Sequence, residues 1–474
     1  MYHILQWGRM DKSRFARVDL EEDMKKFVTI LLTLSLAACM VVTAAACGNN
    51  DNPPAPDDNK SKYDFIDYAE KVYLNTEKYP ELEDQGLFVL GYDEGKGVFD
   101  VRASSAEGAA MVDPKKPTVI LVHGWLGSDF KEDIGYAPQK IKPFLHYKMD
   151  NIPGYEGKEI TEALIGAGYN VMMFEYNRFS VHDIVSNEAW IYAGGTEKYP
   201  YVYMSDYDES GGEAFCKGAT YRDNDICAYS LSQFFAAEYI RMVKAVGDDF
   251  GTAETRIAGH SLGGIMSTVS TNLIYELAKA GQIKTNQVPS RLALLDTYIG
   301  FLKDDEMYET ETVKWSGENF VSGSSSDTYL SYIDNMAEGG IAIETYLAMN
   351  GIVPAMSKFS ASSEYVMNGL AEAGTLKAYR LLEVAAGVVC GKWPTGGGNW
   401  GIDSHVEICK YYLGSMLTGA KTADGKAALS GKLETSEVRA LMGKTFKTTG
   451  GIETSNYGNF VLTECDRFDY NKTK

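Results

Sequence analysis

Short apolar segments alternate with amphipathic segments along most of the chain. Residues 118–122 (TVILV) and 291–295 (RLALL) are apolar runs of the kind found in strands whose two faces are both buried. Between them, residues 228–246 place their apolar side chains on one face of a helix. Strands that alternate with helices predict an α/β fold, with a mostly parallel central sheet flanked by helices.

The same alternation predicts the other strands and helices. A hairpin around the turn DEGKG is expected to open the folded domain. Two late segments, 341–349 and 378–389, fit strands, although a helix fits each of them as well. The full set comprises hairpin strands at 87–92 and 98–102, strands at 169–176 and 255–258, and helices at 159–167 and 264–280.

Two long insertions, residues 178–226 and 302–332, interrupt this alternation. The first is rich in Tyr, Gly and acidic residues, and the second is polar and rich in Ser and Gly. Loops of this length without periodicity are usually functional or mobile. Both follow strands whose carboxyl ends should line a site, so we predict cap or pocket elements; surface decoration is the alternative. The aromatic stretch 190–207 would either receive a lipid, polymer or aromatic acyl group or simply pack on the domain.

The N-terminal region predicts export. From Met24 the chain has two lysines, a long apolar run and a series of alanines that ends at Cys47. This order is typical of a secretory signal peptide over 24–46, not of a transmembrane anchor. A cysteine after alanines resembles the lipidation site of bacterial lipoproteins, so we expect Cys47 to carry a lipid. Cys39 fits the lipoprotein consensus better but would leave an apolar stretch on the mature chain. An ordinary signal peptide with incidental cysteines is the other alternative.

The predicted signal peptide divides the chain into regions. Residues 1–23 match no targeting pattern, so we interpret them as a non-native extension that precedes the true start. Residues 47–62 form a polar, Pro-containing flexible tether, and residues 63–474 form the folded domain. The expected location is the extracellular side of the cell envelope, with the protein lipid-anchored or secreted.

Charge and cysteine usage narrow the possible partners. Lys and Arg total 45 against 65 for Asp and Glu, a formal net charge of −20. Such a surface repels nucleic-acid phosphates and anionic membranes, so we expect no nucleic-acid partner and no membrane contact beyond the lipid anchor. A disulfide between Cys216 and Cys227 would close a short polar loop, although the sequence does not fix the pairing. No cysteine spacing suggests a metal site, and no metal is expected.

Residues 259–263 read Gly-His-Ser-Leu-Gly, a match to the pattern G-x-S-x-G. The pattern alone is weak, but an apolar strand precedes it and a helical pattern follows it. That context predicts a sharp strand-turn-helix elbow in which Gly259, His260 and Gly263 flank a strained, exposed serine. The helix N-terminus would favour negative charge that develops during attack on a carbonyl. Ser261 is therefore the candidate nucleophile.

A serine hydroxyl needs a base, and the chain has only six histidines. His405 lies late, in a predicted loop between a Gly-rich segment and the helical stretch 408–416. That is where the base falls when the order along the chain is Ser, acid, His. His123 and His260 lie inside motifs that fix their backbones, and the other three precede Ser261. His405 is the candidate base.

The acid that orients the base should end a strand between the nucleophile and the base. Asp296 directly follows the apolar run 291–295, so its carboxylate should emerge at the carboxyl edge of the sheet. Asp403 is too close in sequence to His405 to orient it. Three further carboxylates in less defined settings are alternatives: Asp327, Asp334 and Glu344.

An oxyanion hole needs two backbone N–H groups aimed at the developing charge. One is expected from Leu262, directly after the nucleophile. The other is expected from Trp125, in a loop after the strand 118–122 where Gly124 allows close approach. The Trp125 indole would either wall an acyl pocket or lie in the core.

Four short motifs follow one another along the chain: HGW at 123–125, GHSLGG at 259–264, LLD at 294–296 and SH at 404–405. Together they resemble the α/β-hydrolase superfamily and, within it, the secreted lipases and esterases. The similarity covers residues 118–416, least in the two insertions. The resemblance implies an eight-stranded sheet, an acyl-enzyme intermediate and, in some members, a mobile cap. Family lipases often place the acid after the strand that follows the nucleophile's strand, which agrees with Asp296.

The sequence thus predicts a secreted or surface-anchored serine hydrolase that cleaves carboxylic esters with a Ser261, His405 and Asp296 triad. The expected substrate is an ester or a lipid-like small molecule or polymer, and no cofactor is expected. Two alternatives stay open. One is a peptidase or amidase that uses the same triad, and the other is a non-catalytic surface binding protein whose triad is vestigial.

Overall fold

The computed structural model of the protein describes fourteen segments of the unit that spans residues 55–474. The predicted extension 1–23, the signal peptide 24–46 and both candidate lipidation sites, Cys47 and Cys39, lie outside them, as does the tether 47–62. The described segments are 65–67, 82–125, 154–180, 184–192, 202–204, 218–220, 229–298, 325–348, 380–384, 400–421, 427–428, 431–442, 445–449 and 461–465.

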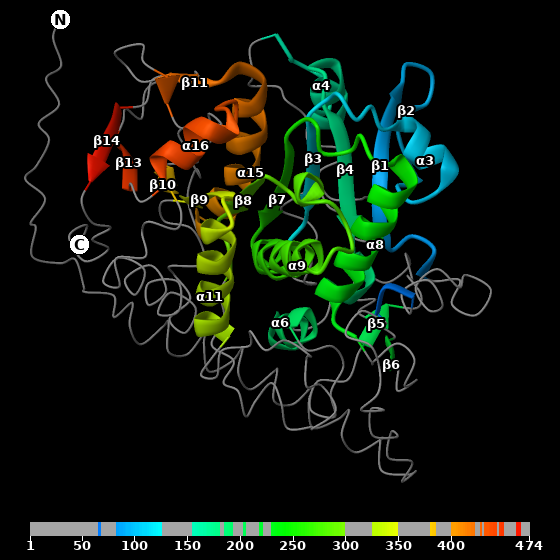
Figure 1. Ribbon diagram of the computed structural model, residues 1–474. Coiled ribbons are helices and arrows are strands. Elements are labelled where there is room, and N and C mark those ends of the chain that lie inside the picture. Colours follow the sequence, from blue (N-terminus) through cyan, green and yellow to red (C-terminus); the bar gives the residue numbers. More distant parts are fainter. Residues whose placement is uncertain are drawn as a thin grey trace, which may run out of the picture. The chain divides into compact units, whose positions relative to one another are not determined.

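A single mixed sheet of ten strands organises the described part of the chain (Figure 1). Its order is β14-β13-β10-β9-β8-β7-β3-β4-β1-β2, and the seven strands from β13 to β4 are parallel to one another. Only β14, at one edge, and β1, near the other, run antiparallel to their parallel neighbours. The strands are β1 (Gly86–Asp93), β2 (Gly97–Arg102), β3 (Thr118–Val122), β4 (Asn170–Glu175), β7 (Thr255–His260), β8 (Arg291–Leu295), β9 (Ala342–Ala348), β10 (Arg380–Val384), β13 (Thr445–Thr449) and β14 (Val461–Cys465).

Helices cover both faces of this sheet because the strand side chains alternate between two apolar clusters. In β3, Ile120 and Val122 pack with α6, α8, α9 and α11, whereas Val119 and Leu121 pack with α4 and α15. The helices are α3 (Ala106–Met111), α4 (Ile160–Gly166), α5 (Asn177–Ser180), α6 (Ile184–Tyr192), α8 (Leu231–Val246), α9 (Leu262–Lys279), α11 (Ser325–Glu338), α15 (Trp400–Thr418) and α16 (Thr435–Leu441). Two short hairpins, β5 (Val202–Met204) with β6 (Gly218–Thr220) and β11 (Ala420–Lys421) with β12 (Ala427–Ala428), lie outside the main sheet.

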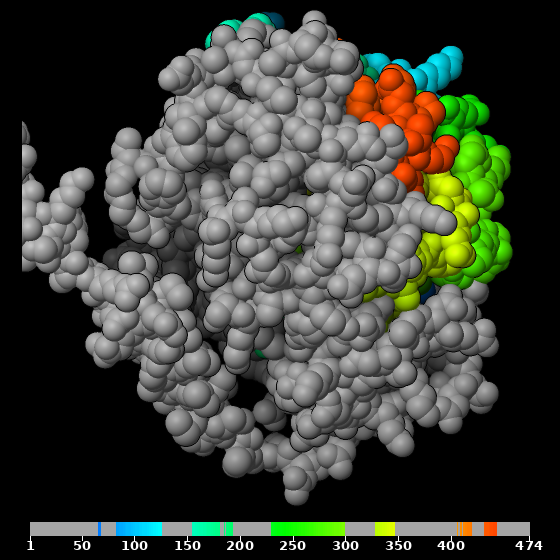
Figure 2. Space-filling model, turned by 90° about the vertical axis from the view of Figure 1, so that its left-hand side faces the viewer, coloured from blue at the N-terminus to red at the C-terminus, as the bar shows by residue number. Residues whose placement is uncertain are grey.

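The α/β class with a mostly parallel sheet flanked by helices is confirmed, as are the predicted strands and helices up to β8. The two ambiguous late segments are strands, β9 and β10. Three expectations about the fold were wrong. The sheet has ten strands where the resemblance implied eight. Residues 184–192 of the first insertion form α6, and residues 325–332 of the second insertion belong to α11, where irregular loops were expected. On the surface of Figure 2, α11 (yellow) and the segment 431–442 (orange-red) are both visible.

The strand order fixes where a site can form. From β3 the chain first adds β4 on one side and then β7, β8 and β9 on the other. In open parallel sheets, ligands bind outside the carboxyl ends of the strands where the order changes direction. The loop after β3, with Trp125, and the turn after β7, with Ser261, therefore meet at this point, and Asp296 follows the adjacent β8.

Among the residues that the structure describes, no helix combines the length and the hydropathy that a membrane span requires.

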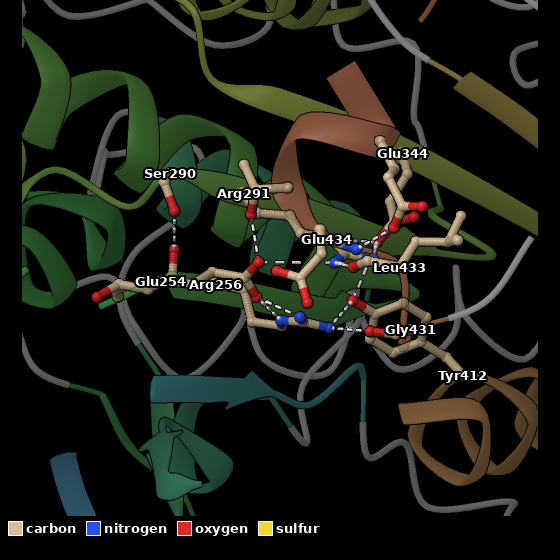
Figure 3. Close-up of polar contacts among 12 residues, drawn as sticks. Glu254, Arg256, Ser290, Arg291, Glu344, Tyr412, Gly431, Leu433 and Glu434 are labelled. Atoms are coloured by element: carbon tan, nitrogen blue, oxygen red, sulfur yellow. Dashed lines mark hydrogen bonds and ion pairs between the residues drawn. The ribbon is translucent and has the colours of Figure 1, made fainter. Parts of the chain in front are cut away.

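The other end of the sheet, where the parallel strands begin, holds a cluster of buried charges (Figure 3). Arg291, which is fully buried at the start of β8, donates to Glu344 of β9, with N–O distances of 2.8 and 2.6 Å. Glu344 also accepts hydrogen bonds from the hydroxyls of Tyr412 (3.0 Å) and Tyr346 (2.8 Å). Arg256 of β7 pairs with Glu254 and donates to the Tyr412 hydroxyl at 3.2 Å. We call these residues the charged cluster.

The charged cluster attaches the segment 431–442 to the sheet. Arg256 donates to the Gly431 carbonyl at 2.5 Å, and Arg291 donates to the Leu433 carbonyl. The Thr435 hydroxyl, at the start of α16, bonds Glu254. Charges inside a protein are stable only when they are paired and hydrogen-bonded. The two carbonyl contacts therefore compensate the burial of the two arginines, and the Thr435 hydroxyl bonds the carboxylate that pairs with Arg256.

Replacing Glu344 by Gln should destabilise the protein by about 3 kcal/mol, because the buried charge of Arg291 loses its closest carboxylate. Urea unfolding followed by circular dichroism measures this free energy. The control is Lys279→Gln, which removes the exposed pair between Lys279 and Glu276 and should change stability by less than about 1 kcal/mol. Equal effects of the two substitutions would contradict the role given to the charged cluster.

Candidate active site

Ser261 lies at the turn between β7 and α9. Its backbone has φ of 54° and ψ of −123°, a conformation that a residue other than glycine adopts only under strain. The Ser261 N–H donates to the carbonyl of Leu295, the last residue of β8, at 2.9 Å. The strand-turn-helix elbow expected from the G-x-S-x-G spacing is therefore present, with Ser261 at the carboxyl edge of the sheet. The expectation of an exposed serine was wrong, because Ser261 is buried.

Close backbone contacts explain the glycines of the elbow. A Cβ on Gly263 would lie 2.2 Å from the carbonyl oxygen of His123, and one on Gly259 would lie 2.3 Å from the carbonyl oxygen of Gly263. Neither distance is compatible with a side chain. The elbow can therefore press against the loop after β3 only because these positions are glycine.

Leu262, one of the two predicted oxyanion-hole residues, is the first residue of α9. Its side chain is fully buried in the apolar cluster that contains α8 and α9. Because the first N–H groups of a helix have no partner within the helix, this end of α9 favours an anion next to Ser261. Only the backbone of Leu262 is available for this role.

Asp296 and His405 form a short hydrogen bond, with 2.5 Å between the carboxylate Oδ2 and the imidazole Nδ1. Asp296 directly follows β8 and is almost fully buried. Its φ is 45°, and its N–H donates to the Tyr346 carbonyl at 2.7 Å, which holds the strained residue at the end of its strand. The carboxylate thus orients the imidazole and leaves Nε2 of His405 for proton transfer.

His405 comes from an element that the sequence did not predict. It was expected in a loop before a helix, but α15 begins at Trp400, so His405 lies inside this helix. The Gly-rich segment ends at Gly398, two residues before α15, and residues 399–405 have no clear apolar periodicity to mark the first turns. The position in space is nevertheless the one expected of a base, next to the residue that follows β8.

The two neighbouring histidines use their ring nitrogens for other contacts. His260 Nε2 lies 2.9 Å from the carbonyl oxygen of His405. His123 Nδ1 lies 2.8 Å from the carbonyl oxygen of Gly124, and its Nε2 lies 3.3 Å from the backbone nitrogen of Tyr176. Among these three histidines only His405 has a carboxylate within hydrogen-bond distance. The geometry therefore favours it as the base.

The loop after β3 approaches Ser261, the candidate nucleophile, closely. A Cβ on Gly124 would lie 2.8 Å from the Cβ of Ser261. The ring of His123 stacks on Tyr176, with 4.2 Å between centroids, and the Tyr176 hydroxyl donates to the His123 carbonyl at 2.7 Å. These contacts fix the backbone that leads to Trp125. The partly buried indole of Trp125 packs against the apolar cluster that contains α8 and α9.

The hydrogen bonds of His123 set the direction of the next peptide. The Tyr176 N–H can only donate, so His123 Nε2 accepts and Nδ1 carries the proton that bonds the Gly124 carbonyl. In a trans peptide the carbonyl and the following N–H point in opposite directions. The Trp125 N–H is therefore turned away from the His123 ring. This is a fixed orientation, as an oxyanion hole requires.

The alternative acids have other environments. Glu344 belongs to the charged cluster at the opposite edge of the sheet. Asp334 lies on α11, where burial, with a contribution from Glu338, raises the pKa of its carboxyl. Asp327 is also on α11 and Asp403 is on α15. Asp296 is the carboxylate that bonds His405.

The structure describes only some of the other segments noted in the sequence, which are the aromatic stretch, the cysteines and the two insertions. Trp190 and Tyr192, which begin the aromatic stretch 190–207, are buried in the core, so this part packs on the domain. Cys409 lies on α15 and is buried. Cys216 and Cys227 lie outside the described residues, as do most of the insertions 178–226 and 302–332.

Sequence reasoning missed the contribution of Tyr176 to the site. This tyrosine directly follows the apolar strand β4, and nothing in its sequence neighbourhood distinguishes it from a residue that closes a strand. Its role follows from the parallel pairing of β3 with β4, which brings position 176 beside His123. In the described segments, no group of three or more His, Cys, Asp or Glu side chains could hold a metal ion.

Comparisons with known proteins give no relative. No family model matches the sequence, and no curated protein or solved structure matches it either. The geometry described above and the sequence motifs are therefore the basis for the function proposed below.

The buried histidine His123 should make the stability depend on pH. Burial lowers the pKa of His123 from 6.5 to about 4, so the unfolded chain binds more protons than the folded protein between these values. The stabilising contribution of the neutral ring is complete above pH 6.5 and is lost as the pH falls toward 4. This amounts to about 3 kcal/mol.

The substitution His123→Asn tests this contribution. Its amide can still donate to the Gly124 carbonyl but does not titrate. The variant should therefore lose less stability than the wild type between pH 7 and pH 4.5, as measured by urea unfolding at each pH. Parallel curves for the two proteins would show that His123 does not contribute in this range.

Proposed function

We propose that the protein is a serine hydrolase that cleaves carboxylic esters through an acyl-enzyme intermediate. The observation that carries the proposal is the 2.5 Å hydrogen bond between Asp296 and His405 beside the strained Ser261. A buried carboxylate that orients a histidine next to a serine in a nucleophile elbow is the arrangement needed to activate a hydroxyl.

The proposed fold family is the α/β hydrolases. The nucleophile follows β7, the acid follows the adjacent β8, and the base comes later, on α15. This order of Ser, Asp and His, together with an elbow that leads from a parallel strand into a helix, supports the assignment. The ten-stranded sheet extends beyond the eight strands of compact members.

In the proposed mechanism, the Ser261 hydroxyl attacks the ester carbonyl while His405 Nε2 takes its proton. The Asp296 carboxylate keeps the proton on Nδ1 and stabilises the imidazolium. The backbone N–H groups of Leu262 and Trp125 donate to the tetrahedral oxyanion. The imidazolium then protonates the departing alcohol. Water, deprotonated by the same imidazole, then attacks the acyl-enzyme, and the imidazolium returns the proton to the Ser261 oxygen as the acid leaves.

The proposed location is the outer side of the cell envelope, with a lipid on Cys47 or as a secreted protein. The support is the order of charged, apolar and small residues over 24–46 in the sequence. An ester or a lipid-like small molecule or polymer outside the cell is the substrate class that fits this location.

Replacing Ser261 by Ala should reduce kcat for short p-nitrophenyl esters by at least about 10⁴-fold, because the acyl-enzyme can no longer form. The unfolding midpoint should stay close to that of the wild type. The control is Ser290→Ala, a serine at the opposite edge of the sheet, which should retain activity. If the wild type is inert on every ester but cleaves an amide with the same acyl group, the protein is an amidase instead.

Replacing Asp296 by Asn should lower kcat by about 10⁴-fold, since an amide does not hold the productive tautomer of His405. Asparagine tolerates a positive φ, so the fold should be retained. The control is Asp334→Asn on α11, which removes one of the alternative acids and should leave kcat within about twofold. The assignment of the acid fails if the Asp334 variant loses activity and the Asp296 variant keeps it.

A further inference from the structure

His260 connects the nucleophile elbow to the helix that carries the base. It is the last residue of β7 and directly precedes Ser261, and it is buried. Its Nε2 lies 2.9 Å from the carbonyl oxygen of His405, which is 145 residues further along the chain. The two imidazole rings also contact each other, with 4.4 Å between their centroids and 43° between their planes.

The contact defines the protonation of His260. A carbonyl oxygen only accepts, so Nε2 of His260 carries the proton that it donates to His405. Burial, with a smaller effect of the neighbouring His405, keeps the pKa of His260 well below its usual value. The ring is therefore neutral, with a proton on Nε2 and none on Nδ1. A neutral ring adds no positive charge beside an imidazole that must itself accept a proton.

The ring of His260 also lies close to the third part of the site. A Cβ on Gly124 would lie 3.4 Å from His260 Nδ1 and 3.0 Å from the His260 carbonyl oxygen. His260 thus lies between the loop that leads to Trp125 and the start of α15, and its own backbone continues into Ser261. One residue is therefore next to all three elements that would supply the nucleophile, the base and the oxyanion hole.

The hydrogen bond from His260 restricts a movement of the His405 backbone that the side-chain contacts of His405 do not restrict. The Asp296 carboxylate fixes the rotation of the His405 ring through Nδ1. It does not fix the distance between the backbone of α15 and the elbow, on which the separation of Nε2 from the Ser261 hydroxyl depends. The donation from His260 to the His405 carbonyl sets that distance, because His260 and Ser261 are consecutive residues.

We infer that His260 is a positioning residue, which holds the backbone of His405 in place beside the nucleophile elbow through the His405 carbonyl. The inference rests on the proposed function for the role of His405 as the base. A misplacement of about 1 Å in a catalytic group can lower the rate by about 100-fold, so the loss of this anchor should be visible in kcat.

Two amides with different reach test the inference. In His260→Gln the amide nitrogen stands as many bonds from the backbone as Nε2 of histidine, so it can donate to His405. In His260→Asn the amide ends one bond earlier, at the position of Nδ1, and does not reach. We expect kcat for p-nitrophenyl esters to fall about tenfold to hundredfold in the Asn variant, with KM little changed, and to fall less than about threefold in the Gln variant.

Tyr239→Phe is the matched control for the loss of a buried hydrogen bond. Tyr239 donates to the Gln287 carbonyl at 2.6 Å, away from the site, so its variant should lose stability and keep kcat. If the Asn and Gln variants have the same kcat, or if their kcat values follow stability alone as in Tyr239→Phe, the inference is overturned.

Nuclear magnetic resonance gives a readout that needs neither turnover nor a variant. In the wild type, the ¹⁵N shifts of His260 should report a neutral ring protonated at Nε2, and the Nδ1 proton of His405 should resonate at low field because of its short bond to Asp296. A His260 protonated at Nδ1 would overturn the inference even if every variant failed to fold. A wild type that is inactive on esters but gives the expected spectrum would refute the proposed function and leave the contact intact.

Discussion

The hydrogen bond between His405 and Asp296 joins two segments that are 109 residues apart, and the rest of the site is arranged around it. It connects the end of β8, in the middle of the sheet, to α15, which packs on one face of that sheet. A donor and an acceptor 2.5 Å apart tolerate little displacement, so the helix and the strand must be placed independently of this contact. The packing of α15 against β8 and β9 provides that placement.

Strain at two residues shows how the sheet supports the site. Ser261 and Asp296 are the two non-glycine residues with positive φ in the described segments, and such conformations cost about 1–3 kcal/mol each. In both cases the backbone N–H bonds a carbonyl of the next strand, Leu295 for Ser261 and Tyr346 for Asp296. The hydrogen bonds between neighbouring strands thus continue as far as each strained residue. The hydrogen bonds of the buried parallel sheet therefore stabilise the strained backbone of the proposed nucleophile and of the proposed acid.

Much of this arrangement could be predicted from the sequence because it depends on local signals. Apolar runs defined β3 and β8, and the glycines around Ser261 defined the elbow, since close backbone contact requires glycine there. The start of α15 was missed because its first turns have little periodicity. The contacts of His260, Tyr176 and the charged cluster depend on which strands become neighbours, and no pattern within one segment contains that information.

Helix α15 relates the charged cluster to the site at the opposite edge of the sheet. Tyr412, whose hydroxyl bonds Glu344 and receives a hydrogen bond from Arg256, is seven residues after His405 on the same helix. Seven residues are about two helical turns, so both side chains lie on the same side of α15, about 10 Å apart along its axis. The helix is therefore attached to the sheet at two points, through His405 in the candidate site and through Tyr412 in the charged cluster.

An apolar contact alone would let a helix slide or rotate, because such packing is not directional. Directional bonds at both points remove that freedom, which gives a physical reason for buried charges in a region that takes no part in the proposed chemistry.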